Sequence, residues 1–266
     1  MNICVCIKQV PDTNEIKVDP VTHTLVRKGV PSIVNPFDTY AQEVGVRLKE
    51  KLGGKVVVIS MGPEQAKEAI KTCLSVGADA GYLISSRKFG GSDTLATSYI
   101  LSEAIKAVEE KEGLKFDLIL CGKQAVDGDT AQVGPQISEH LDIPVISYAQ
   151  DIKVEGDSVI VQRQFEDRYH VLKAKMPCLI TALSELNEPR YMTPGGIFDA
   201  CDAEITTWGR ADLTTLDDAN IGLAGSPTKI AKASDKVRKG AGEKVTLDPE
   251  EAVDYIMDKL AEKHVI

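Results

Sequence analysis

Short apolar runs alternate with amphipathic stretches along the first half of the chain. The runs are continuous and rich in Val, Ile and Leu, which is typical of parallel strands buried on both faces. They cover residues 2–8, 55–60, 81–85 and 116–121. The stretches between them repeat apolar positions at helical spacing over residues 36–52, 64–76, 94–110 and 131–141. This alternation predicts a doubly wound α/β fold, in which helices wrap a mostly parallel sheet.

Capping residues mark the ends of two of these helices. Asp38 is expected to be the N-cap of the first helix, which Gly53 and Gly54 end. Pro63 is expected at the start of the second helix, where its missing N–H would have no helical partner anyway. The second helix therefore follows its strand after a tight turn.

The pattern changes after the fourth helix. A short strand is expected at residues 144–147, and the runs 152–154 and 158–164 flank Glu155-Gly156-Asp157, a hairpin turn signal. Residues 169–182 offer a further strand pair. We therefore expect antiparallel strands to extend one edge of the sheet.

Few periodic stretches occur between residues 186 and 248, and residues 222–244 are rich in Gly, Ala, Ser and Lys. Long irregular segments are rare inside compact domains. We therefore divide the chain into an α/β nucleotide-binding domain at residues 1–200 and an extended C-terminal arm with a helix at residues 201–266. This arm either lies on a partner chain, which we favour, or packs on its own core. The expected helix has Asp248 as its cap, Pro249 as its first residue, and an apolar stripe of Val253, Ile256, Met257 and Leu260.

Composition narrows the possible partners. The formal net charge of -9 argues against nucleic acid, because phosphate backbones are bound by clustered Lys and Arg. No apolar run approaches the ~20 residues that span a bilayer, and the chain opens on a strand instead of an export signal. We therefore expect a cytoplasmic protein without membrane insertion.

The six cysteines form no CxxC, and no His stands at ligand spacing from a Cys pair. Neither a zinc nor an iron-sulfur site is predicted. Cys4 and Cys6 alternate along the first strand and so share one of its faces. No Ser or Cys forms a recognised motif with any of the four histidines, and we predict no catalytic residue. Any difficult chemistry would belong to a bound cofactor.

Loops at one edge of the predicted sheet form the candidate site, because open parallel sheets bind ligands beyond the carboxyl ends of their strands. These loops are residues 8–12, 61–63 and 122–134. The last reads GKQAVDGDTAQVG and combines glycines with the start of a helix, whose free N–H groups favour a phosphate. Asp127 and Asp129 fit turn, capping or ribose-binding roles, and their spacing falls short of a calcium loop. We interpret this loop as a phosphate cradle and predict no metal.

The standard nucleotide motifs are missing. Neither GxGxxG nor GxxxxGK[ST] occurs, which argues against the standard dinucleotide fold and the P-loop. Residues 89–94 read FGGSDT and partly resemble the SGGxDS loop of ATP-pyrophosphatases. This makes Asp93 and Thr94 candidate nucleotide contacts and leaves an adenine-nucleotide hydrolase or ligase as an alternative.

Six stretches spread over nearly the whole chain together resemble the beta subunit of electron transfer flavoproteins. They are CIKQVPD, VNPFD, SMGP, GADAG, GKQAVDGDTAQVG and KMPCLITALSELNEPRY. Residues 161–182 resemble the signature segment of that family, with departures at Arg168 and His170. The resemblance implies a fold like that of the adenine nucleotide alpha hydrolases and a heterodimer with an alpha subunit, which residues 201–266 would clasp.

The resemblance also places an adenine nucleotide in the loops that sheet topology selects. In the family, the nucleotide lies against the positions of Cys6, residues 35–38, Met61 and residues 122–133. With the other candidates added, the expected cofactor-binding residues are Cys6, Lys8, Asn35, Pro36, Phe37, Asp38, Met61, Gly62, Asp93, Thr94, Gly122, Lys123, Gln124, Ala125, Val126, Asp127, Gly128, Asp129, Thr130, Ala131, Gln132 and Val133.

The phosphate loop bears on which cofactor is bound. One branch of the family carries AMP and typically reads DDDxNQTG. Residues 127–134 here read DGDTAQVG and resemble the electron-bifurcating branch, which carries a second FAD. Gly128 and Ala131 replace larger polar residues, which would make room for a bulkier diphosphate. The AMP branch also tends to have Tyr where Thr13 stands. We therefore expect FAD, with AMP as the alternative.

Electron-bifurcating relatives indicate the activity and the partners. By resemblance, NADH reduces the FAD of this subunit. One electron then passes to ferredoxin or flavodoxin, and the other passes through the FAD of the alpha subunit to an acyl-CoA dehydrogenase. Redox activity is expected only in the complex with the alpha subunit. The loop at Arg190 and Tyr191 would dock on the dehydrogenase, with Pro194 in place of the family's Leu and Met192 as a substitute anchor.

Overall fold

Residues 1–12, 31–228, 240 and 242–266 are described by the computed structural model. The chain divides into two units, Met1–Lys232 and Ala233–Ile266, and each is described by itself below. None of the helices formed by the described residues has the length and apolar character that crossing a membrane requires. The first unit contains every candidate cofactor-binding residue.

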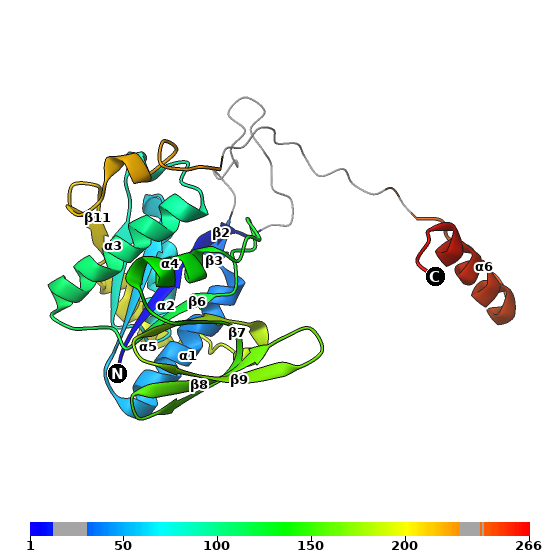
Figure 1. Cartoon of the computed structure of the whole chain (residues 1–266), viewed down its shortest axis with the longest axis horizontal. Helices are drawn as coiled ribbons and strands as arrows, with labels where there is room; N and C mark the ends of the chain where they lie inside the picture. The colour runs from blue at the N-terminus through cyan, green and yellow to red at the C-terminus, as the bar shows by residue number, and fades with distance from the viewer. Residues whose placement is uncertain (13–30, 229–239, 241) are drawn as a thin grey trace. The chain divides into compact units, whose positions relative to one another are not determined.

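A nine-stranded sheet forms the centre of the first unit (Figure 1). Its strands are β1 (Asn2–Ile7), β4 (Lys55–Met61), β5 (Ala80–Ile84), β6 (Leu118–Gly122), β7 (Val145–Glu155), β8 (Ser158–Gln164), β9 (Tyr169–Lys175), β10 (Cys178–Ala182) and β11 (Thr206–Trp208). They lie in the order β11-β5-β4-β1-β6-β10-β7-β8-β9. Neighbours from β11 to β7 are parallel, and the last two pairs are antiparallel. A separate antiparallel pair consists of β2 (Gln9–Pro11) and β3 (Ser32–Val34). The predicted mostly parallel sheet with antiparallel edge strands is confirmed.

Helices cover both faces of the parallel part of the sheet (Figure 1). They are α1 (Pro36–Leu52), α2 (Lys67–Ser75), α3 (Thr94–Glu112), α4 (Val133–Leu141) and α5 (Pro194–Asp202). α1 and α2 pack on one face, with α5 against α2, and α3 and α4 pack on the other. Side chains of β1 alternate between the two faces, so Ile3 and Val5 belong to one apolar core and Cys4 and Cys6 to the other.

The direction of winding reverses between two central strands. β1 leads to α1 on one face, and its neighbour β6 leads to α4 on the opposite face. Because the two connections leave in opposite directions, such a switch point is where open α/β sheets form a crevice. The fold therefore places a binding site between the residues that follow Ile7 and those that follow Gly122.

Asp38 is not the N-cap that the sequence predicts. α1 begins at Pro36, its N-cap position is Asn35, and no side chain caps it. The Asp38 carboxylate instead accepts hydrogen bonds from the backbone N–H groups of Lys8 and Gly122. The physical reason is that the ends of β1 and β6 present two N–H groups at this point, and unpaired buried donors are costly.

One predicted strand pair is also wrong. β9 is antiparallel to β8 as expected, but β10 is a parallel strand inserted between β6 and β7. All five of its residues are buried, as in the other central strands. The continuous apolar run CLITA is the signal that the prediction overlooked. The predicted hairpin is confirmed, with Glu155 opposite Ser158.

Regular structure continues beyond residue 200, so the sheet-bearing unit extends past the expected boundary. β11 is the edge strand next to β5, and Leu213, Leu216 and Ile221 are buried in the core on the α3 side. These parts escaped prediction for a physical reason. α5 contains the pair Gly195-Gly196, and β11 has only three residues, which is too short for a periodic signal.

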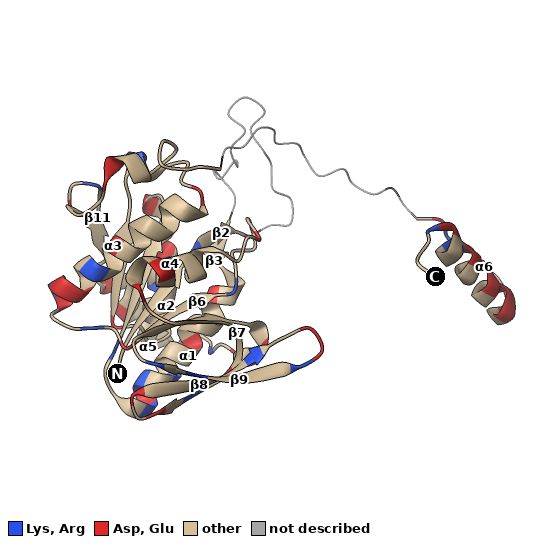
Figure 2. Ribbon diagram, viewed as in Figure 1, with Lys and Arg blue, Asp and Glu red and all other residues tan. Residues whose placement is uncertain are grey.

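The second unit contains α6 (Pro249–Glu262), which follows Asp248 as expected. Three members of its predicted apolar stripe are exposed to solvent. Val253 is 58%, Ile256 is 55% and Met257 is 50% exposed. Figure 2 shows the acidic residues of this helix (red) along its length. α6 is therefore an amphipathic helix whose apolar stripe is open.

Candidate functional site

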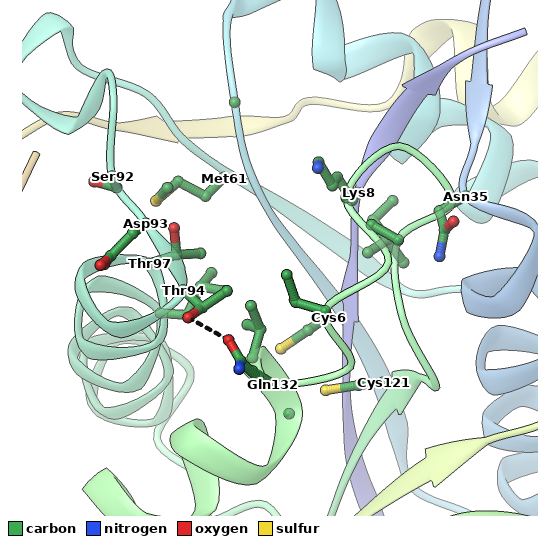
Figure 3. Close-up of a pocket in the computed structure, with 18 of the residues that line it drawn as sticks. Cys6, Lys8, Asn35, Met61, Ser92, Asp93, Thr94, Thr97, Cys121 and Gln132 are labelled. Carbon is green, nitrogen blue, oxygen red and sulfur yellow. Dashed lines mark hydrogen bonds between the residues drawn. The ribbon is translucent and has the colours of Figure 1, made fainter. Parts of the chain in front are cut away.

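A cavity of about 710 Å³ lies at the carboxyl edge of the sheet. Its walls come from the loops that follow β1, β4, β5 and β6 and from the first turns of α3 and α4. Figure 3 shows Lys8 and Asn35 on one side and Asp93 and Thr94 on the other. Its size lies within the ~300–1,000 Å³ that small-molecule and cofactor sites occupy.

Gly122 ends β6 in close contact with α1. A Cβ at this position would lie 2.3 Å from Oδ1 of Asp38 and 2.6 Å from the carbonyl carbon of Phe37. The N–H of Gly122 donates to Oδ1 of Asp38 at 3.1 Å, and the N–H of Lys8 donates to Oδ2 at 2.7 Å. Asp38 is 6% exposed, and this burial raises its pKa to about 7. Only glycine fits where the predicted phosphate cradle begins.

Asn35 fastens the middle of the same loop. Its Nδ2 donates to the carbonyl of Gln124 at 2.8 Å, and its Oδ1 accepts from the N–H of Val126 at 3.0 Å. The side-chain amide of Gln124 in turn donates to Oδ1 of Asp129 at 2.7 Å. Because these bonds form within the chain, residues 124–129 are ordered before a ligand binds, and less ordering entropy is lost on binding.

The end of the loop presents unpaired N–H groups. Asp129 and Ala131 have left-handed φ angles of 52° and 53°, and α4 begins at Val133. Within the described part of the chain, the backbone N–H groups of residues 130–134 donate to no protein acceptor. Free donors and the helix dipole both favour an anion at a helix N-terminus. The loop therefore offers the donors that a phosphate group requires.

Three cationic side chains line the cavity, and two of them are engaged within the chain. Nζ of Lys8 contacts Oδ1 of Asp127 at 2.6 Å, and the side chain of Asp127 is 4% exposed. Nζ of Lys123 lies 5.9 Å from the ring centroid of Phe37. Arg87, the first residue of the short helix η2 (Arg87–Phe89), forms no ion pair with any residue that the structure describes. Its guanidinium remains free for a ligand phosphate.

The first turn of α3 forms the opposite wall. Asp93 caps this helix, because its Oδ1 accepts from the N–H of Ala96 at 3.0 Å. Its Oδ2 accepts from the N–H of Thr228, also at 3.0 Å. Oγ1 of Thr94 donates to Oε1 of Gln132 at 2.9 Å, which connects α3 with α4 (Figure 3). Both oxygens of Asp93 thus serve the fold.

Buried thiols also line the cavity. Cys6 and Cys121 are register neighbours on β1 and β6, and both contribute to the wall. Hydrogen bonding to Cys6 and burial raise the pKa of the Cys121 thiol well above its usual range. Cys4 and Cys6 lie on one face, as their alternation predicts. Among the described residues, no cluster of His, Cys, Asp and Glu has the arrangement of a metal site.

Most of the predicted cofactor-binding residues meet at this cavity. Those in its wall are Cys6, Lys8, Asn35, Asp38, Met61, Gly62, Asp93, Thr94, Gly122, Lys123, Gln124, Ala125, Gly128, Asp129, Thr130, Ala131, Gln132 and Val133. Pro36, Phe37, Val126 and Asp127 do not line it. Thr13, which bears on the choice between AMP and FAD, lies outside the described residues.

Sequence reasoning missed the loop after β5. Ser85, Ser86, Arg87 and Thr97 line the cavity, although none of them was a candidate. The rule that ligands bind at the carboxyl ends of parallel strands also applies to β5, so it could have found the first three. The partial FGGSDT motif drew attention only to the turn at Asp93.

The predicted docking residues are not part of the cavity wall. Nε of Arg190 donates to Oε2 of Glu43 at 2.9 Å, and its Nη2 donates to Oε2 of Glu50 at 2.9 Å. These bonds raise the pKa of the guanidinium above its usual range. Tyr191 is 95% exposed and Met192 is 48% exposed, and Pro194 is the first residue of α5. These bonds, called the Arg190 clamp below, hold Arg190 against α1. Tyr191 and Met192 lie on the surface next to it.

Comparison with known proteins identifies the family. Residues 22–219 match the model of the electron transfer flavoprotein domain. The chain is 50% identical over 266 residues to the electron transfer flavoprotein subunit beta of Clostridium acetobutylicum, covering 100% of both chains. It is 49% identical over 268 residues to the caffeyl-CoA reductase-Etf complex subunit CarD of Acetobacterium woodii, again covering 100% of both. It is 42% identical over 273 residues to protein FixA of Azotobacter vinelandii, covering 99% of this chain and 96% of that protein. The chain therefore belongs to the electron transfer flavoprotein family, among its beta subunits.

Proposed function

We propose that this chain is the beta subunit of an electron-bifurcating flavoprotein and that its cavity binds FAD, which NADH reduces. The main support is the set of unpaired N–H groups at residues 130–134, beside a cavity of about 710 Å³. A dinucleotide diphosphate needs such donors, and a helix N-terminus supplies them without a Rossmann fingerprint. When bound, the flavin would accept two electrons together from NADH and release them one at a time.

The residues present fit such a cofactor. The N–H groups of residues 130–134 would bind the diphosphate, and the free guanidinium of Arg87 would offset part of its charge. Because Gly122 has no Cβ, the loop after β6 can pass close to α1, and its phosphate-binding residues line the cavity. Met61 and Phe89 supply apolar wall that would exclude water from an aromatic ring system.

Small side chains in the phosphate loop support FAD over AMP. No atom lies within 4 Å of a Cβ placed on Gly128, so the space there is open. Ala131 carries only a methyl group at a left-handed φ of 53°, a conformation that Asn adopts more readily. Two relatives are consistent with coupling to acyl-CoA chemistry: CarD belongs to a caffeyl-CoA reductase-Etf complex, and another is the acryloyl-CoA reductase electron transfer subunit gamma of Anaerotignum propionicum.

We propose two routes for the electrons. One leads to a ferredoxin or flavodoxin, and the other leads through the FAD of the alpha subunit to an acyl-CoA dehydrogenase. Tyr191 and Met192 would contact the dehydrogenase, because the clamp on Arg190 holds these exposed side chains in place. Exposed aromatic and Met side chains are enriched at protein interfaces. The open stripe of α6 would contact the alpha subunit.

Counting the cofactors of the purified heterodimer tests this proposal. After denaturation we expect close to two FAD per heterodimer and no AMP, and before it we expect NADH to bleach the flavin absorbance. A double variant, Gly128→Asp with Ala131→Asn, fills the cradle with polar side chains and should retain only the FAD of the alpha subunit. Asp142→Asn is the matched control, because Asp142 also has a left-handed φ of 53° but lies outside the cavity wall.

Two rivals have distinct outcomes. One FAD together with released AMP would identify an AMP-binding beta subunit that transfers electrons without bifurcation. Turnover of ATP by the isolated chain, abolished in Asp93→Ala, would identify an adenine-nucleotide hydrolase or ligase. We expect no such turnover, because both oxygens of Asp93 already bind backbone N–H groups.

A further inference from the structure

A buried carboxylate lies at the switch point of the sheet. Asp38 is 6% exposed, and it forms no ion pair with any residue that the structure describes. Its two oxygens accept from the N–H groups of Lys8 and Gly122. Lys8 directly follows β1 and Gly122 ends β6, so these are the two strands between which the winding reverses. One side chain therefore connects both edges of the crevice.

We propose that Asp38 is a positioning residue for the nucleotide: its ionised carboxylate holds the loop after β6 against the end of β1, and protonating it weakens nucleotide binding. The inference rests on the proposed function only in that the cavity binds an adenine nucleotide. It applies equally to FAD and to AMP.

The connection from Asp38 to the phosphate donors is continuous. Oδ1 fixes the N–H of Gly122, and the absence of a Cβ at Gly122 lets the two groups approach. The next segment of the loop is fastened by Asn35, and it leads to the free N–H groups of residues 130–134. A carboxylate accepts at both oxygens, whereas a protonated carboxyl uses one oxygen as an O–H donor. Protonation therefore weakens one of the two bonds that set where the loop begins.

Thiols are the titratable groups that face Asp38 from the packed elements. They are Cys6 of β1, Cys73 of α2 and Cys121 of β6. The ammonium of Lys8 contacts Asp127 instead. Burial is the main cause that raises the pKa of Asp38 to about 7, so its ionised form costs the fold free energy at neutral pH. Such a cost is typical of a group retained for function.

Stability and binding should respond to pH in opposite directions. An unfolded Asp has a pKa of about 3.9, so between about pH 4 and pH 7 the folded chain holds a proton on Asp38 that the unfolded chain has lost. The free energy of unfolding therefore falls as the pH rises through this range. Nucleotide binding should strengthen as the pH rises through about 7, because the ionised form holds the loop. If Asp38 served the fold alone, nucleotide affinity would not rise with pH while the free energy of unfolding falls.

Nucleotide affinity as a function of pH tests the inference. The heterodimer stripped of nucleotide would be titrated separately with FAD and with AMP between about pH 6 and about pH 8. We expect wild-type binding to be about tenfold weaker at the lower pH, which corresponds to one hydrogen bond to a charged group. Asp38→Asn should bind about tenfold more weakly than wild type at the higher pH and show little pH dependence, because its amide keeps one acceptor and does not ionise. Asp151→Asn, exposed on β7, is the matched control and should keep the wild-type profile.

Three outcomes would overturn the inference. The first is a wild-type pH profile in Asp38→Asn, and the second is loss of the pH dependence in Cys6→Ser, which would assign it to a thiol. The third needs no variant: wild-type affinity that rises as the pH falls. Urea denaturation at both pH values confirms that each variant is folded. If the cavity takes AMP and not FAD, FAD binds only at the site of the alpha subunit, one per heterodimer, while the AMP titration still reports on Asp38, so the two proposals fail separately.

Discussion

Single residues of the phosphate loop differ in the space around them. At Gly122 an added Cβ would meet Oδ1 of Asp38 at 2.3 Å and the backbone of Phe37 at 2.6 Å. Six positions later, an added Cβ at Gly128 would meet nothing within 4 Å. Backbone atoms cannot move aside as a flexible side chain can, so the first glycine is required by packing and the second is not.

This difference predicts that one added methyl group destabilises the chain at Gly122 and has little effect at Gly128. Gly122→Ala should lower the free energy of unfolding by about 1–3 kcal/mol or more, because it forces α1 away from β6. The same variant should lose nucleotide, since Asp38 shifts with α1. Gly128→Ala is the matched control and should stay within about 0.5 kcal/mol of wild type. Urea denaturation followed by circular dichroism measures both, and equal stabilities would contradict the packing argument.

Ion pairs fix the segment between β10 and α5 to another element, α1. Glu43 of α1 is 4% exposed, and it accepts hydrogen bonds from Arg47 and Arg190. Burial acts to raise the pKa of Glu43, but the bonds from the two guanidinium groups hold it below its usual range. Its carboxylate therefore stays ionised and keeps the segment before Tyr191 in place at neutral pH.

Removing this clamp should affect partner docking as well as stability. Arg190→Ala leaves the buried Glu43 with Arg47 as its remaining partner, and we expect a loss of about 2 kcal/mol in the free energy of unfolding. Electron transfer to the proposed partner, an acyl-CoA dehydrogenase, should slow, while transfer to a small dye should not. Arg190→Lys should recover little, because one ammonium cannot span two carboxylates as a guanidinium does.

The matched control for the clamp is Arg168→Ala. Arg168 and Asp167 form an ion pair on the surface, with side chains 63% and 73% exposed. Such pairs contribute little, so we expect a change within about 0.5 kcal/mol. Slowed transfer to the dye in Arg190→Ala would place the defect at the cofactor instead of the docking surface.

At the scale of the whole molecule, the end of the first unit determines which C-terminal residues can be deleted without disturbing the cavity. Ile221 is 4% and Ser226 is 2% exposed, and Oγ of Ser226 accepts from the N–H of Asp93 at 2.8 Å. Together with the bond from Thr228 to Asp93, these contacts tie residues 221–228 to the wall of the cavity. The segment therefore belongs to the α/β unit and not to a separable arm.

Two truncations separate the roles of the units. Deletion of residues 229–266 should leave the α/β unit folded but weaken its association with the alpha subunit, because it removes the open stripe of α6. Deletion of residues 222–266 should also destabilise the cavity, because Asp93 loses Ser226 and Thr228. Co-purification yield and thermal unfolding measure the two effects. Full co-purification of the shorter deletion would refute a clasping role for the C-terminal unit.

Local sequence patterns are enough to predict most of the parallel core and the loop that carries the candidate phosphate donors. Strands buried on both faces need continuous apolar runs, and amphipathic helices need apolar positions at helical spacing, so both leave local patterns. Glycines next to a helix start likewise mark residues 122–134 within one short stretch. The hairpin at Glu155-Gly156-Asp157 was predictable because its turn residues adjoin its strands.

Features that depend on residues far apart in the chain are visible only in the folded molecule. Asp38 accepts from Gly122, 84 positions later, and no local pattern distinguishes that role from helix capping. β10 lies between β6 and β7 because the centre of the sheet offers it two parallel neighbours. Long-range contacts of this kind are set by packing and hydrogen bonding between elements, and neighbouring residues do not encode them.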